Sequence, residues 1–191
     1  SIPDVAQKKK DWNGLISGFK ASDLVFLDES GCNTDMTRRY AYSLGGSRAV
    51  DSAPLSKPKN TTILSSIQLD GTLRYTTFSG GTTVERFKRY LETDLLPHLN
   101  GNSVLIMDNM KSHHAKAVRN LLDSSGVRYI YLPPYSPDLN PIEKLWSKVK
   151  AFLRKFKART LDALPNAIQN AFHSVTISDC SGWFRFCGYA L

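Results

Sequence analysis

The stretch "DLVFLDES", residues 23–30, places four apolar residues in a row and then an acid, Asp28, at the end of the run. A short continuous apolar run is typical of a strand buried on both faces, whereas a half-buried strand alternates. The run "SVLIMDN", residues 103–109, has the same design and ends near Asp108. A third buried run, "VRYIYLP" at 127–133, leads into a proline-rich segment. We therefore expect central strands that are covered by helices on both faces.

Two further β-rich runs and several helical patterns connect these strands. Asp70 and Gly71 separate "TTILSSIQL" from "TLRYTTFSG", and a DG pair between such runs is the strongest short-range signal for a hairpin. Apolar residues at helical spacing predict helices over residues 82–99, over 113–126 and from 142 onwards. This order of elements predicts an α/β fold, with a five-stranded mixed sheet and helices on both of its faces.

Length and composition indicate one soluble domain with a polyanionic partner. The chain of 191 residues fits a single domain, 1–191, with an inserted loop or hairpin at 31–60. Its 25 Lys and Arg against 17 Asp and Glu give a net charge of +8, which favours a polyanion, although a solvated basic surface is the simpler alternative. Three cysteines without a CxxC pair argue against a disulfide framework or a structural zinc site. No apolar run reaches the length of a membrane-spanning helix, so we expect no membrane association.

Three acids are candidates for one metal site. Asp28 and Asp108 both close buried strands, and ligands of open α/β sheets bind beyond the carboxyl ends of strands. Neither "FLDES" nor "IMDN" contains a base that would neutralise the acids, so a divalent cation is the natural partner. Glu143, after the third buried run, could complete the site. Oxygen ligands favour Mg²⁺ or Mn²⁺, and two such ions would suit phosphodiester chemistry.

Glu143 also has a purely structural interpretation. It lies in "LPPYSPDLNPIEKLW", residues 132–146, where Asn140 suits a helix N-cap and Glu143, three residues later, would close a capping box. Against this alternative, the helix carries seven basic residues and no acid between Lys144 and Arg159. Ser147, Lys150 and Arg154 share the flank of Glu143, so the acid stands beside a cationic track.

Together, "FLDES", "IMDN" and "LPPYSPDLNPIEKLW" resemble the motifs of mariner-type transposases, and specifically their bacterial insertion-sequence branch. The 34 residues between Asp108 and Glu143 match the spacing in that family. The resemblance implies a ribonuclease-H-like catalytic domain in which Asp28, Asp108 and Glu143 bind the two metal ions. Asn109 matches the second member of a frequent Asp-Asn pair, and we expect it to orient Asp108.

The resemblance also implies partners. We expect transposon-end DNA, target DNA cut at a TA dinucleotide, and a homodimer assembled on DNA, in the cytoplasm of a bacterium and associated with its nucleoid. Helix-turn-helix domains that read the element's ends precede the catalytic domain in this family, and we expect them to lie outside this chain. The candidate DNA-binding residues are Lys144, Lys148, Lys150, Arg154, His113 and His114. For the two histidines, metal ligation and a role at a helix start remain alternatives.

Two other functions remain open at this point. A ribonuclease-H-like nuclease that only hydrolyses DNA would use the same metal site. An inactive relative would act as a DNA-binding or assembly module, although the presence of all three acids argues against it.

Overall fold

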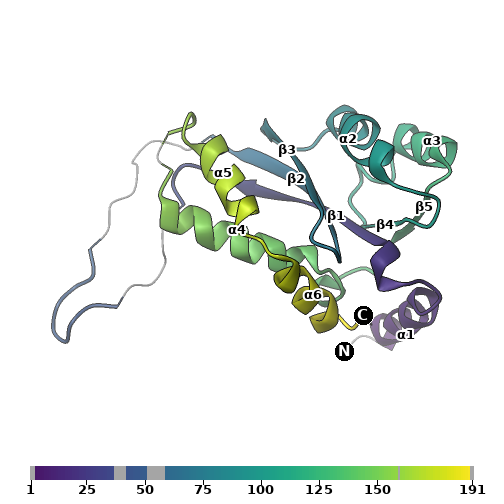
Figure 1. The fold of residues 1–191 in the computed structure, drawn as a ribbon, viewed down its shortest axis with the longest axis horizontal. Helices are drawn as coiled ribbons and strands as arrows, with labels where there is room; N and C mark the ends of the chain where they lie inside the picture. The colour runs from purple at the N-terminus through teal and green to yellow at the C-terminus, as the bar shows by residue number, and fades with distance from the viewer. Residues whose placement is uncertain (1–2, 37–41, 51–58, 159, 190–191) are drawn as a thin grey trace.

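The computed structural model describes residues 3–36, 42–50, 59–158 and 160–189, and a five-stranded sheet lies at its centre (Figure 1). The strands, in spatial order, are β3 (Leu73–Ser79), β2 (Thr61–Gln68), β1 (Leu24–Cys32), β4 (Val104–Met107) and β5 (Arg128–Tyr131). β1 pairs antiparallel with β2 and parallel with β4, while β4 pairs parallel with β5. The prediction of a five-stranded mixed sheet is confirmed.

Helices cover both faces of the sheet, as predicted (Figure 1). One face carries α2 (Val84–Tyr90) and α3 (Lys116–Ser125), which pack on a buried cluster that includes Val25 and Leu27 of β1. The other face carries α4 (Ile142–Phe156), α5 (Leu164–His173), α6 (Ile177–Phe186) and α1 (Pro3–Ile16). Leu24 and Phe26 face this second cluster. The two faces of β1 therefore explain why its apolar run is continuous.

The helices differ in detail from the sequence-based expectations. The helix expected over 82–99 is α-helical only to Tyr90 and continues as a π-helical segment, Leu91–Leu95, and a 3₁₀ turn, Leu96–His98. Pro97 in that turn has no N–H to donate, which prevents a regular α-helix from continuing. α3 begins at Lys116 and ends at Ser125, and its C-cap is Gly126, whose φ of +71° is the left-handed conformation that glycine adopts without strain.

The insert predicted at 31–60 is only partly described. β1 extends to Cys32, and residues 42–50 contain no helix or strand. Residues 37–41 and 51–58 lie outside the described residues. Within the described ranges, none of the helices has the length and apolar character needed to cross a bilayer.

Phe26 joins the central strand to the last helix and the C-terminal segment. Its ring meets Phe184 of α6 edge-on, with centroids 5.4 Å apart, and lies 5.0 Å from the ring of Tyr189. Phe26 and Phe184 are fully buried. The strand that carries Asp28 is therefore held by aromatic packing two residues before the acid.

Truncating this contact should destabilise the fold. We expect Phe26→Ala to lower the free energy of unfolding by about 3–5 kcal/mol, because it removes a fully buried ring and leaves a cavity. Phe156→Ala, at a ring of α4 that is 47% exposed, serves as the control and should cost about 1 kcal/mol or less. Urea denaturation followed by circular dichroism measures both. Equal losses in the free energy of unfolding for the two variants would show that packing of Phe26 contributes no more to stability than an exposed ring does.

Candidate active site

Asp28, Asp108 and Glu143 line a single cavity of about 430 Å³. Asp28 lies in β1 and Asp108 follows the last residue of β4, and these neighbouring parallel strands pair Leu27 with Met107. The register therefore brings the two aspartates to the same edge of the sheet. Glu143 comes from the first turn of α4. The remaining wall is formed mainly by the proline-rich segment, residues 132–137 with Asn140, and by Asn109 and Met110.

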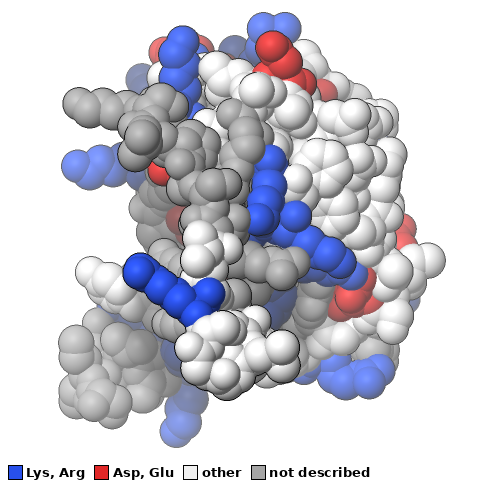
Figure 2. Space-filling model, turned by 90° about the vertical axis from the view of Figure 1, so that its left-hand side faces the viewer, with Lys and Arg blue, Asp and Glu red and all other residues white. Residues whose placement is uncertain are grey.

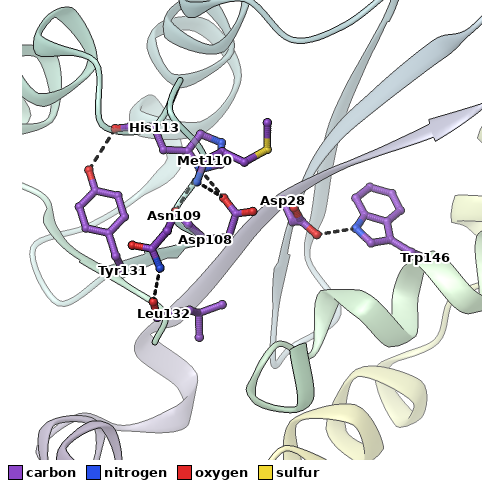
Figure 3. Close-up of polar contacts among 8 residues, drawn as sticks. All are labelled: Asp28, Asp108, Asn109, Met110, His113, Tyr131, Leu132 and Trp146. Atoms are coloured by element: carbon purple, nitrogen blue, oxygen red, sulfur yellow. Dashed lines mark hydrogen bonds and ion pairs between the residues drawn. The ribbon is translucent and has the colours of Figure 1, made fainter. Parts of the chain in front are cut away.

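Asp28 is almost completely buried, with 7% of its surface exposed. Its Oδ2 accepts a hydrogen bond of 3.0 Å from Nε1 of Trp146, a residue of α4 (Figure 3). Burial raises the pKa of Asp28 to about 7, although the donors Glu29 N–H and Trp146 lower it; the charges of Asp108 and Glu143 raise it further. The three acids therefore interact electrostatically, and a cation between them would relieve both the desolvation and the repulsion.

Asp108 is held by two donors on the opposite side of the cavity. Its Oδ1 accepts a 3.0 Å hydrogen bond from the backbone N–H of Met110 and lies 2.8 Å from Nδ1 of His113 (Figure 3). Partial burial opposes ionisation of Asp108, but the hydrogen bonds from His113 and Met110 outweigh it and lower the pKa of this carboxyl. Asp108 is thus favoured in its charged form. The imidazole ring of His113 is in turn fixed by stacking on Phe87, with centroids 4.3 Å apart.

Glu143 does not cap its helix. No side chain caps the N-terminus of α4, and Oδ1 of Asn140 is buried without a hydrogen-bond partner among the described residues. The capping-box interpretation is therefore wrong, because the chain enters α4 through a 3₁₀ turn, Pro137–Leu139, and Pro141 already has helical torsion angles. The exposed side chain of Glu143 forms no hydrogen bond or ion pair within the described part of the chain, which leaves its carboxylate available to a ligand.

The donor set suits a hard divalent cation. The cavity lining contains three carboxylates and no Lys, Arg, His or Cys. Carboxylate oxygens are the ligands that Mg²⁺ and Mn²⁺ prefer, and such ions usually retain several waters. Among the described residues, no three His, Cys, Asp or Glu side chains are grouped closely enough to enclose a metal ion by themselves. The lining therefore fits an ion that also takes oxygen ligands from water or a phosphate.

Comparison with known proteins shows which family this chain belongs to. The family described as "DDE superfamily endonuclease" matches residues 23–165, which include all three acids. This chain belongs to that family. The Tc1 transposase of Caenorhabditis elegans is 30% identical over 97 residues, which cover 49% of this chain and 36% of that protein.

The fold is that of the mariner transposase Mos1. A Mos1 paired-end complex with the left transposon end superposes with a TM-score of 0.79 at 19% identity, covering 97% of this chain and 59% of that one. A Mos1 paired-end complex with Mn superposes with a TM-score of 0.80 at 20% identity, and again 97% of this chain and 59% of that one are covered. The Mos1 catalytic domain with Mg and raltegravir superposes with a TM-score of 0.72 at 17% identity. This match covers 97% of this chain and 90% of that one. This chain thus spans about a third of Tc1 transposase and three fifths of the Mos1 chains in the complexes.

Two of the predicted supporting residues need correction. The side-chain amide of Asn109 donates to the backbone carbonyl of Leu132, and therefore ties the end of β4 to the end of β5 (Figure 3). The orientation of Asp108 falls instead to His113 and the backbone of Met110. His113 was expected to contact DNA, but its side chain is 0% exposed and offers no surface for that contact. His114 is partly exposed and packs on Tyr131, with ring centroids 4.0 Å apart.

The four basic candidates on α4 divide into two flanks. Lys144 lies 3.8 Å over the ring of Phe186, and Lys148 is ion-paired with Asp179, so both side chains are engaged with α6. Lys150 and Arg154 instead line a separate cavity next to the end of β1. All four side chains are partly buried, and they differ in their contacts: Lys144 and Lys148 contact α6, whereas Lys150 and Arg154 line the cavity.

Sequence reasoning missed the part that Trp146 plays at the site. Trp146 fits the apolar spacing that predicted a helix from 142 onwards, and it is 3% exposed in α4. A signal was present, because residue i+3 from Glu143 shares its side of the helix and an indole N–H needs a buried acceptor. His113 was similarly considered as a DNA contact, a metal ligand or a residue at a helix start, although its five-residue separation from Asp108 permits a local hydrogen bond.

Removing the indole donor should weaken metal binding more than it weakens the fold. We expect Trp146→Phe to reduce Mn²⁺ affinity, measured by isothermal titration calorimetry, by about tenfold or more, because Asp28 loses the hydrogen bond that orients it. Trp183→Phe, at a partly buried indole of α6, controls for the change of ring. Unchanged Mn²⁺ affinity in Trp146→Phe, with Trp183→Phe also unchanged, would contradict an orienting role.

Proposed function

We propose that this chain is the catalytic domain of a cut-and-paste DNA transposase. Its reaction is metal-dependent cleavage of DNA at the ends of a mobile element, followed by transfer of the freed 3′ hydroxyl into target DNA. The observation that carries the proposal is a cavity lined by three acids and no base, in a member of the DDE endonuclease family with the Mos1 fold. The bound transposon end in the Mos1 complex supports DNA as the substrate.

We assign Asp28, Asp108 and Glu143 as the ligands of two Mg²⁺ or Mn²⁺ ions. When bound, such ions activate a water or a 3′ hydroxyl and stabilise the leaving oxygen of the phosphodiester. Hydrogen bonds from Trp146 and His113 keep Asp28 and Asp108 oriented. Glu143 stands at the exposed side of the cavity, where it can adjust as DNA and metal enter.

The segment before Glu143 is held by both ends of the chain. Nζ of Lys9 in α1 donates to the carboxylate of Asp138 at 2.8 Å, and the hydroxyl of Tyr189 donates to the carbonyl of Leu139 at 2.6 Å. These contacts and four prolines restrict the connection from β5 to α4. Restricting this connection limits where Glu143 can lie, as a shared metal site requires.

Several finer features belong to the same proposal. We propose the bacterial insertion-sequence branch, on the strength of the proline-rich motif, and a single catalytic domain over 1–191 that works with DNA-reading domains outside this chain. Target joining at a TA dinucleotide, a homodimer on DNA and a site of action at the bacterial nucleoid follow from that assignment. Lys150, Arg154 and His114 are the residues that we propose to contact DNA.

A plasmid-nicking assay with Mg²⁺ tests the metal ligands. We expect Asp108→Asn and Glu143→Gln to nick supercoiled plasmid at least about a hundredfold more slowly than wild type, because each loses a charged ligand. Glu92→Gln is the matched control and should nick at the wild-type rate. Glu92 is exposed, lies in the segment Leu91–Leu95 that follows α2, and pairs with Lys88 of α2. Wild-type nicking by a correctly folded Glu143→Gln variant would refute the assignment.

A labelled, pre-cut DNA duplex with a free 3′ hydroxyl, added to the same assay, separates the alternatives. A transposase joins the label to the plasmid, a hydrolytic nuclease nicks without joining, and an inactive relative binds DNA and does neither.

A further inference from the structure

A second cavity, of about 320 Å³, lies at the other end of the two elements that build the acidic site. We call it the distal cavity; its lining consists of Gly31, Cys32, Asn33, Asp35, Met36, Lys150 and Arg154. Lys150 and Cys32 line this cavity together. Burial raises the pKa of the Cys32 thiol to about 11, and the charge of Lys150 partly opposes that rise. Lys150 is therefore directed toward the end of β1.

The acidic site and the distal cavity share one strand and one flank of one helix. β1 carries Asp28 to the first and Cys32 to the second, while α4 carries Glu143 to the first and Arg154 to the second. At 100° per residue, Lys150 and Arg154 lie within about 20° of the direction of Glu143, whereas Lys155 lies about 120° away. At 1.5 Å per residue, they lie about 10 Å and 16 Å farther along α4.

The two cations of the distal cavity are available to an anion. Neither Lys150 nor Arg154 forms an ion pair with an acid in the described part of the chain, although Asp35 shares the lining. Two positive charges against one negative charge leave the cavity cationic. On the face where α4 ends, Lys and Arg side chains form separate groups near the middle (Figure 2).

We propose that the distal cavity binds a backbone phosphate of the DNA strand whose reacting phosphodiester lies at the acidic site. The inference rests on the proposed function. Each strand of B-DNA advances 3.4 Å per nucleotide along the duplex axis, so with α4 lying along that axis 10–16 Å corresponds to a phosphate about three to five nucleotides from the reacting bond. Such a contact carries no sequence information, but it fixes the register of the strand on α4. Without metal the three acids repel the DNA phosphate backbone, whereas the distal cavity attracts it. Both ends of α4 therefore contribute to the alignment of the DNA strand.

Neighbouring residues of α4 provide a matched test. Arg154→Ala removes a cation from the distal cavity, while Lys155→Ala removes one from an exposed position that lines none of the cavities described here. Binding of a fluorescent DNA duplex is measured by anisotropy at several salt concentrations, with Ca²⁺ in place of Mg²⁺ to prevent cleavage. We expect Arg154→Ala to bind about fivefold to tenfold more weakly at 0.1 M salt and to lower the slope of log K against log salt by about 0.9. Arg154→Lys should restore most of the affinity and most of the salt slope, and Lys155→Ala should change neither the affinity nor the slope.

The outcomes distinguish this proposal from the function on which it rests. If wild type binds DNA but Arg154→Ala and Lys155→Ala have equal slopes, the distal phosphate site is wrong and the transposase assignment stands. If wild type does not bind DNA at all, both are wrong.

Joining assays test the register. Neutral methylphosphonates placed three to five nucleotides from the reactive 3′ end should slow joining by wild type about tenfold, but should add little to the defect of Lys150→Ala/Arg154→Ala. An equal effect of these substitutions on wild type and the double variant would overturn the register.

Discussion

The architecture of this protein depends on keeping two carboxylates close together without neutralising them. The parallel register of β1 and β4 brings Asp28 and Asp108 to one edge of the sheet. Burial and the charge of Asp108 disfavour the charged form of Asp28, whereas hydrogen bonds favour the charged form of Asp108. The residues that hold them are neutral donors or backbone groups, Trp146 for Asp28 and the Met110 N–H for Asp108, with the stacked ring of His113 behind. The cavity lining contains no Lys or Arg that could pair with the acids in place of a metal ion. A site organised in this way is stabilised when a divalent cation enters it.

α4 connects this electrostatic arrangement to the substrate. Its buried stripe, which includes Leu145 and Val149, fixes the rotation of the helix against the sheet. That rotation determines at once where the indole of Trp146 meets Asp28, where Glu143 faces the cavity, and which of the cations remain free. Lys144 and Lys148 turn toward α6, whereas Lys150 and Arg154 turn toward the end of β1. A single packing interaction therefore determines both the placement of the proposed metal ligands and the cations that we propose to contact DNA.

Much of this arrangement could be predicted from local sequence. The uninterrupted apolar runs before Asp28 and Asp108 predicted central strands, and the helical spacing after Pro141 predicted α4, because burial imposes those patterns directly. The structure brings the three acids to one cavity, and their metal-binding role remains a prediction.

What could not be predicted depends on long-range contacts. The capping box at Asn140 failed because the preceding 3₁₀ turn changes the entry of the chain into α4. The burial of His113 depends on Phe87, which lies 26 residues earlier in α2, and the partner of Asn109 is Leu132, the residue after β5. The division of the α4 lysines into two flanks follows from α6, a helix that sequence analysis did not anticipate.

The central claim is that the three acids share divalent metal ions, and diffraction from crystals grown with Mn²⁺ tests it most directly. Anomalous difference maps at the manganese edge should show two peaks about 4 Å apart, bounded by the carboxylates of Asp28, Asp108 and Glu143. Well-diffracting crystals at millimolar Mn²⁺ with no anomalous peak between Asp28 and Asp108 would contradict it.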